Sequence, residues 1–246
     1  NVISPVLALT KWLIKMTIQE FIIENYPNES VGLILKDDTI VYLTNISETP
    51  EKSFKIDGQE IAEHLDNIKS IWHSHCVNPS RPSLYDARTP SLKDMESQKQ
   101  SNVEWLIYAC DGYNVTEPVS LPRKSNNNYL DREFIWFIND CYTLVQDYYK
   151  HELNIELKDY ILHDYKNVRK SHAVFDEHIT EFGFIELYDL NDLRNGDLFI
   201  VDNSGFEANH LVIYHDGQLL HQGLLSCIEP FETYSGKFKK RLRYAG

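Results

Sequence analysis

His73 and His75 stand one residue apart at the end of an apolar run, and their type and spacing could support metal chemistry. The run from Ile68 to His73 predicts a β-strand, and side chains at positions i and i+2 of a strand lie on the same face of its sheet. Two neutral imidazoles side by side need only a carboxylate and a water molecule to complete a catalytic zinc site. Because a bare His-x-His pair also occurs in surface loops, its interpretation depends on the rest of the chain.

Carboxylates that could complete such a site lie on both sides of the histidines in the sequence. Glu29 comes directly before the first predicted strand. After the histidines, a proline-rich stretch contains two Ser-x-x-Asp patterns, one at Ser83 and Asp86 and the other at Ser91 and Asp94. The second pattern predicts the start of a helix, because a serine N-cap and an acidic residue at the third helical position satisfy free backbone N–H groups.

These residues, in this chain order, resemble the JAMM/MPN family of zinc metallopeptidases across residues 16–115. The resemblance implies an MPN-like α/β sandwich with a mixed sheet. It also implies that Zn2+ is held by His73, His75 and one aspartate, and that Glu29 is the general base that activates water. The serine of the Ser-x-x-Asp motif would support the oxyanion.

The identity of the third metal ligand is open between two aspartates. Ten residues, 76–85, separate the second histidine from Asp86, which is the usual spacing in the family and would pair this ligand with Ser83. However, Pro90 would break the helix that normally follows the ligand. Asp94 opens an uninterrupted helix behind Ser91, so we favour Asp94 and keep Asp86 as the alternative.

Cys141 begins a second set of candidate residues. It lies in the first turn of a predicted helix, where it meets the positive end of the helix dipole, which favours the thiolate. A lone cysteine is more often a small buried hydrophobe. A nearby base would distinguish the two interpretations.

Two histidines on a predicted hairpin could supply that base. Asp216-Gly217 predicts a two-residue type I′ turn between strands at 209–215 and 218–222. The resulting register makes His210 and His221 diagonal neighbours on one sheet face, about 7 Å apart at Cα. This is the geometry of a base and its orienting group in a Cys–His–polar triad.

Asp-Cys at a helix start, Asn-His-Leu-Val-Ile-Tyr at 209–214 and Leu-Leu-His ending at His221 resemble the NlpC-type papain-like cell-wall peptidases across residues 129–246. The resemblance implies a papain-like α+β domain in which Cys141 attacks, His210 activates the cysteine and His221 orients His210. Tyr129 matches a family tyrosine that lies over the site.

The order of the predicted elements indicates an α+β protein of two domains. The first domain is expected at 16–116 and the second at 129–246. Residues 117–128 combine prolines and polar residues without periodicity, which predicts a linker. Residues 1–15 are expected to be an N-terminal extension, either native upstream sequence or non-native sequence.

Composition limits the class of partner. The 246 residues carry a net charge of −13, which argues against nucleic acid, and the apolar run at 2–14 is too short to span a membrane. The four cysteines contain no C-x-x-C pair, which favours free thiols. A basic cluster at 237–243 alternates with aromatic residues and is interpreted as the solvated face of a strand.

A metallopeptidase-like domain followed by an NlpC-type domain resembles the tail-tip assembly proteins of siphophages. The resemblance implies a hydrolase of peptidoglycan stem peptides that also serves in tail assembly, with other tail-tip proteins and peptidoglycan as partners. It implies a place in the virion tail tip after assembly in the host cytoplasm, and action in the host cell envelope. Two alternatives are a mainly structural tail component with weak or inactive sites, and a first domain that processes a phage tail protein.

Overall fold

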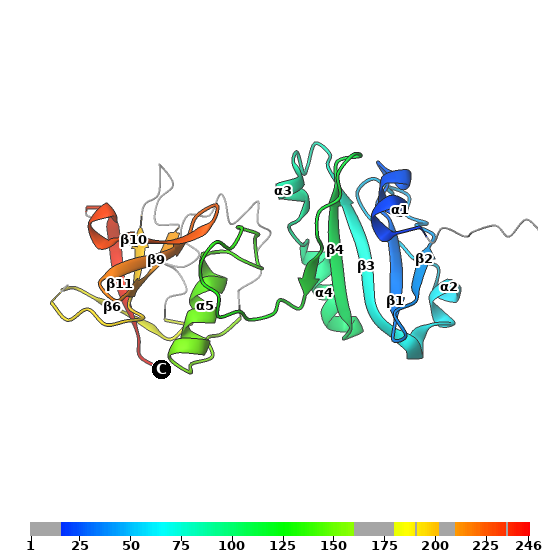
Figure 1. The fold of residues 1–246 in the computed structure, drawn as a ribbon. Helices are drawn as coiled ribbons and strands as arrows, with labels where there is room; N and C mark the ends of the chain where they lie inside the picture. Colours follow the sequence, from blue (N-terminus) through cyan, green and yellow to red (C-terminus); the bar gives the residue numbers. More distant parts are fainter. Residues whose placement is uncertain (1–15, 160–179, 190, 202–209, 235) are drawn as a thin grey trace, which may run out of the picture.

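The structure is a computed structural model that describes residues 16–159, 180–189, 191–201, 210–234 and 236–246 (Figure 1). The expected N-terminal extension, residues 1–15, lies outside the described residues. The described chain is mixed α and β with two separate sheets. We call the five-stranded sheet with its helices the first unit, and the six-stranded sheet with its helix the second unit.

The first unit is a mixed sheet in the order β2-β1-β3-β4-β5, with only β3 and β4 parallel. A parallel pair needs a crossover connection, and here the chain between β3 and β4 contains α4. The strands are β1 (Val31–Leu35), β2 (Ile40–Leu43), β3 (Ile68–Cys76), β4 (Glu104–Cys110) and β5 (Val119–Leu121). The helices are α1 (Ile18–Asn25), α2 (Gly58–Ala62), the 3-10 turn η1 (Leu65–Asn67), α3 (Leu84–Ala87) and α4 (Leu92–Ser101).

Each face of this sheet carries its own apolar cluster. Trp72 of β3 packs with Ile18 and Ile22 of α1, while Ile71 packs with Met95 of α4 on the other face. Side chains alternate along a strand, so residues 71, 73 and 75 share the face that α4 covers. This alternation directs both histidines of β3 toward α4.

The second unit is a six-stranded sheet in the order β10-β9-β8-β7-β11-β6, antiparallel at each pairing. Its helix α5 (Cys141–Glu152) buries an apolar face, Cys141, Leu144, Val145 and Tyr148, against the sheet. The strands and turn are β6 (Phe184–Leu187), β7 (Leu198–Val201), β8 (His210–His215), β9 (Gln218–Gln222), β10 (Ser226–Pro230), η2 (Phe231–Tyr234) and β11 (Phe238–Tyr244).

The connection between the units differs from the predicted linker. Strand β5 lies inside the range 117–128 and pairs with β4, so that part of the range belongs to the first sheet. The sequence did not reveal this strand, because three residues are too few to show a periodic alternation of apolar and polar side chains. Farther along, Ile135 and Phe137 are buried in the apolar cluster of the first unit, whereas Phe134 donates its backbone N–H to Leu224 of the second. The domain boundaries themselves stay a prediction.

A buried ion triad attaches α5 to this connection. Asp147 of α5 is fully buried, and its Oδ1 accepts a hydrogen bond of 2.8 Å from Arg123. A guanidinium nitrogen of Arg132 lies 3.0 Å from the other carboxylate oxygen, an ion pair without hydrogen-bond alignment. One helix residue therefore holds two arginines of the connecting segment.

The basic cluster near the end of the chain is not a solvated strand face throughout. Arg241 of β11 is buried, and its guanidinium lies 2.6 Å from Asp197. Arg243 bonds the same carboxylate at 2.8 Å. The interpretation was wrong for Arg241, because Leu242 takes the face that packs on α5 and Arg241, on the other face of β11, is buried beside Asp197.

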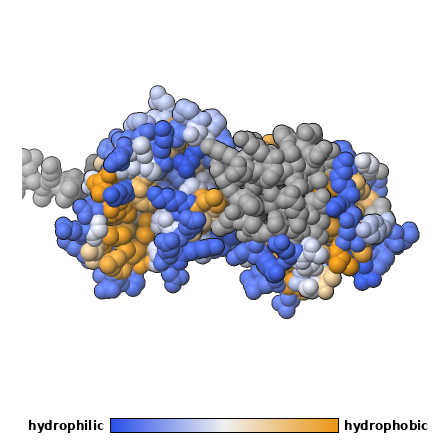
Figure 2. Space-filling view, turned by 180° about the vertical axis from the view of Figure 1, so that it is seen from behind, coloured by the Kyte–Doolittle hydropathy of each residue, from blue (hydrophilic) through white to orange (hydrophobic). Residues whose placement is uncertain are grey.

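The outer surface mixes residue types. Figure 2 shows hydrophobic residues among hydrophilic ones on the surface of the first unit. Across the described residues, the structure has no helix with the length and apolar character that a membrane span needs.

Candidate functional site

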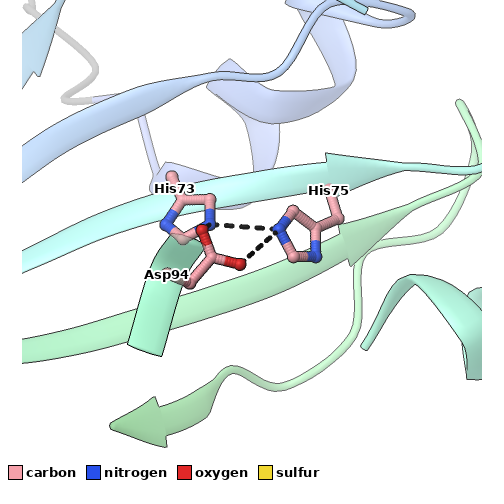
Figure 3. Close-up of side chains that lie close together, drawn as sticks. All are labelled: His73, His75 and Asp94. Carbon is pink, nitrogen blue, oxygen red and sulfur yellow. Dashed lines mark hydrogen bonds and ion pairs between the residues drawn. The ribbon is translucent and has the colours of Figure 1, made fainter. Parts of the chain in front are cut away.

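His73, His75 and Asp94 converge between β3 and the start of α4 (Figure 3). The Nε2 atoms of the two histidines lie 3.2 Å apart. The Asp94 carboxylate oxygens lie 3.4 Å from His73 Nε2 and 3.1 Å from His75 Nε2. All three side chains are buried, so the strand and the helix start hold the three groups in a fixed arrangement.

The surroundings of the two imidazoles favour metal binding. Nδ1 of His75 lies 2.9 Å from the carbonyl oxygen of Ala87, so Nδ1–H donates there and Nε2 is the nitrogen that faces Asp94. Nδ1 of His73 is buried with no hydrogen-bond partner among the described residues. Two imidazole nitrogens and a carboxylate are a donor set that suits zinc. These residues therefore fit the metal that the sequence suggested.

Asp94, rather than Asp86, is the aspartate that the fold brings to the histidines. Asp94 stands at the third position of α4 and accepts the backbone N–H of Ser91 at 2.7 Å in a capping box. Burial would raise the pKa of Asp94, but His73 and His75 hold it well below its usual range. Asp86 lies in α3, where it bonds Ser83 at 2.6 Å and takes no part in the cluster.

Glu29 lies beside this cluster, but its carboxylate has a partner that the sequence did not suggest. A cavity of about 120 Å³ is lined by Glu29, His75, Ser91 and Asp94 among others. Glu29 Oε1 accepts a hydrogen bond of 2.9 Å from Arg81, whose other guanidinium nitrogen lies 3.4 Å from His75 Nε2. Arg81 sits in the loop after β3, where sequence patterns gave no signal for it.

Cys141 opens α5 behind the N-cap Asp140, as predicted, but its environment favours the thiol over the thiolate. Burial and the nearby Asp140 carboxylate raise the pKa of Cys141 to about 12. The backbone N–H groups of Leu211 and Tyr142 donate to the sulfur and lower the pKa by less. The expectation that the helix start favours the thiolate was wrong, because desolvation outweighs the dipole here.

His210 and His221 meet as the hairpin register predicted. Asp216 and Gly217 have positive φ, as a type I′ turn requires, and Val212 pairs with His221. Nε2 of His210 lies 3.2 Å from Nδ1 of His221. Burial, and then the charge of His221, lower the pKa of His210 to about 3, so His210 is neutral at neutral pH.

His210 comes directly before the strand residue that contacts Cys141. Leu211, whose backbone N–H bonds the Cys141 sulfur, is the residue that follows His210 in β8. This backbone contact joins the strand that carries His210 to the start of α5. Nε2 of His210 faces His221, so Nδ1 is the other nitrogen of its ring.

Tyr129 does not lie over this cluster. Its hydroxyl donates to Glu152 at 2.9 Å, and its ring packs on Tyr148. Glu152 ends α5, eleven residues after Cys141 and thus about 16 Å along the helix axis. The prediction for Tyr129 was wrong, because sequence distance did not reveal which end of the helix the preceding segment contacts.

Three more residues surround the far side of His221 and were missed from the sequence. Nε2 of His221 lies 3.3 Å from the sulfur of Cys227, 3.4 Å from a carboxylate oxygen of Glu229 and 3.4 Å from the hydroxyl of Tyr234. Extending the strand register by one more strand would have found the first of them, because Cys227 pairs directly with His221.

Comparison with known proteins bears on the second unit. The sequence model of the NlpC/P60 family matches residues 119–244, half of the chain. The chain belongs to the NlpC/P60 family. Cys141, His210 and His221 all lie within the NlpC/P60 segment, and most of the first unit precedes it. The chain is also similar to "Tail tip assembly protein K" of Escherichia phage N15, with 24% identity over 223 residues that cover 88% of this chain and 86% of the relative.

Proposed function

We propose that the second unit is a cysteine peptidase that cleaves amide bonds in the stem peptides of peptidoglycan. The observation that carries this proposal is the contact of Cys141, at a helix start, with the backbone of Leu211, the residue after His210, which in turn lies 3.2 Å from His221. Membership of the NlpC/P60 family supports the same reaction. In this proposal Cys141 is the nucleophile, His210 the base and His221 the group that orients the base.

The proposed reaction starts from a neutral thiol and a neutral imidazole. As the Cys141 sulfur attacks the amide carbonyl, its proton passes to His210 Nδ1. The backbone N–H of Cys141 at the start of α5 is a donor for the developing oxyanion. His210 then protonates the leaving amine, and water releases the acyl group from the sulfur.

The test is incubation of the full-length protein with purified peptidoglycan fragments, followed by mass spectrometry of newly formed termini. Wild-type protein is expected to release cleaved stem peptides, and His210→Ala protein is expected to release none. Absence of cleavage by the wild type, together with normal incorporation into tails, would favour the structural alternative.

We further propose that the protein acts at a phage tail tip, with other tail-tip proteins as partners. The similarity to the tail tip assembly protein of phage N15 across most of both chains supports this location. In this setting the protein would be assembled in the host cytoplasm and would act in the host cell envelope.

A second proposed site, in the first unit, is a metallopeptidase-like centre. The convergence of His73, His75 and Asp94 supports Zn2+ as its metal, with Glu29 as general base in the same cavity. Zn2+ there would supply a Lewis acid for a peptide carbonyl. Ser91, the N-cap of α4, would support the oxyanion, and a peptide of a phage tail protein is the alternative substrate.

Asp94→Asn is expected to weaken zinc binding by at least about 100-fold, because it replaces an anionic ligand with a neutral amide. Titration calorimetry of the full chain with Zn2+ measures the change. Asp86→Asn is the matched control, since Asp86 caps α3 away from the histidines. A larger loss in Asp86→Asn than in Asp94→Asn would contradict the ligand assignment.

Arg81→Met is expected to strengthen zinc binding by about tenfold or more, because a guanidinium lies 3.4 Å from a ligand atom of the cluster and repels the cation. The same calorimetry measures it. Lys52→Met is the control, since Lys52 lines the same cavity but is 61% exposed and screened by water. Weaker binding in Arg81→Met would show that Arg81 instead holds Glu29 in place.

A further inference from the structure

Both ring nitrogens of His221 face polar groups, and the proposed peptidase reaction uses only Nδ1. Nδ1 faces His210, whereas Nε2 faces the Cys227 sulfur at 3.3 Å and a Glu229 oxygen at 3.4 Å. The strand register causes this convergence. Cys227 of β10 is the direct partner of His221 of β9, and Glu229 follows two residues later on the same face.

The three donor atoms have the spacing of a tetrahedral zinc site. With Zn–N and Zn–O bonds near 2.0 Å and Zn–S bonds near 2.3 Å, ligand atoms of such a site lie about 3.3–3.6 Å apart. The Nε2-to-sulfur and Nε2-to-oxygen distances are 3.3 and 3.4 Å, and all three atoms lie within 4.8 Å of one another. His221 is buried, while Cys227 and Glu229 are partly exposed, which leaves solvent access for an ion.

We propose that His221, Cys227 and Glu229 bind Zn2+ and that this binding inactivates the cysteine peptidase site. The metal site rests on the donor geometry alone. The inactivation rests in addition on the proposed peptidase function, since it concerns His210 as the base for Cys141.

Without metal, the Glu229 carboxylate sets the proton positions of the two histidines. A carboxylate only accepts, so the neutral His221 ring carries its proton on Nε2 and donates it to Glu229. Nδ1 of His221 is then an acceptor and takes the Nε2–H of His210. His210 is left with a free lone pair on Nδ1, which is the form that can take a proton from Cys141.

Metal binding would reverse these proton positions on the two histidines. When Nε2 of His221 gives its lone pair to Zn2+, the neutral ring must carry its proton on Nδ1. That proton is donated to Nε2 of His210, so the proton of His210 moves to Nδ1. A protonated Nδ1 cannot accept the thiol proton. His210 can then no longer act as the base, although no side chain has moved.

Binding is tested by cobalt substitution in the full chain carrying Cys141→Ala and Asp94→Asn. These changes remove the nucleophile sulfur and a ligand of the other cluster. Co2+ is expected to give a thiolate-to-cobalt charge-transfer band in the near ultraviolet, and a further Cys227→Ser change is expected to abolish it. Cys110→Ser is the control and is expected to keep the band. Absence of the band, or its persistence in the Cys227→Ser protein, would overturn the site.

Inactivation is tested with Zn2+ on protein with an intact Cys141, each variant being compared with itself without zinc. Asp94→Asn protein is expected to lose cleavage activity as zinc is added. Addition of Cys227→Ser is expected to raise the half-inhibiting zinc concentration by about tenfold or more. Equal inhibition of both proteins would overturn the switch and indicate zinc on Cys141 itself. An inactive wild type would count against the peptidase proposal, and the cobalt spectrum would still decide the metal site.

Discussion

Cys141→Ala protein is expected to cleave peptidoglycan fragments at least about 10⁴-fold more slowly than wild type. The reason is that the proposed route needs a covalent acyl-enzyme, and removal of the nucleophile of a triad leaves only the contributions of substrate binding and oxyanion stabilisation. The measurement is the initial rate of release of cleaved stem peptides, followed by mass spectrometry at saturating substrate.

The fold itself is not expected to depend on this thiol. Cys110→Ala is the matched control, because Cys110 is another buried free cysteine but belongs to the first unit. It is expected to retain the wild-type rate, and circular dichroism checks that both variants remain folded. If Cys141→Ala cleaves at the wild-type rate while His73→Ala does not, wall cleavage belongs to the first unit and the assignment falls.

Asp147→Asn is expected to lower the free energy of unfolding by about 3 kcal/mol. The carboxylate is fully buried between Arg123 and Arg132, of which Arg132 is almost fully buried as well. Its neutralisation leaves two guanidinium groups without an anion in a poorly hydrated place, which is costlier than the loss of a surface pair. Urea denaturation followed by far-ultraviolet circular dichroism measures the change.

An exposed ion pair beside the same helix provides the comparison. Lys150 of α5 pairs with Glu156 at 2.8 Å in solvent. Glu156→Gln is expected to leave the urea midpoint unchanged, since water and salt screen exposed pairs. Equal effects of the two substitutions would mean that the triad at Asp147 contributes no more than a surface contact.

The local structure around both sites was accessible from the sequence because short-range rules govern it. The hairpin turn at Asp216-Gly217 determines which residues of β8 and β9 face each other, and this determined the His210–His221 contact. Likewise, a serine N-cap three residues before Asp94 specifies the helix start that delivers the carboxylate. In both cases one chemical preference of a few residues decides the geometry.

Contacts that depend on tertiary packing were not accessible in this way. Arg81 bonds Glu29 across 52 residues of sequence, and no periodicity relates an arginine in a loop to a carboxylate that precedes a strand. Tyr129 was assigned to the wrong end of α5 for the same reason. The pKa of Cys141 is likewise set by how deeply the helix start is buried, and only the assembled fold determines that depth.

The order of strands in the second sheet places the residues around His221 on strands that differ in their free energy of local opening. β8 and β9, which carry His210 and His221, each have a neighbour on both sides, whereas β10 is an edge strand. Edge strands exchange with solvent at a lower free energy than interior ones. Local opening of β10 would take Glu229 away from His221 and leave the two histidines aligned. The proposed catalytic pair thus lies in the interior of the sheet, whereas Glu229, which would set its proton positions, lies on an edge strand.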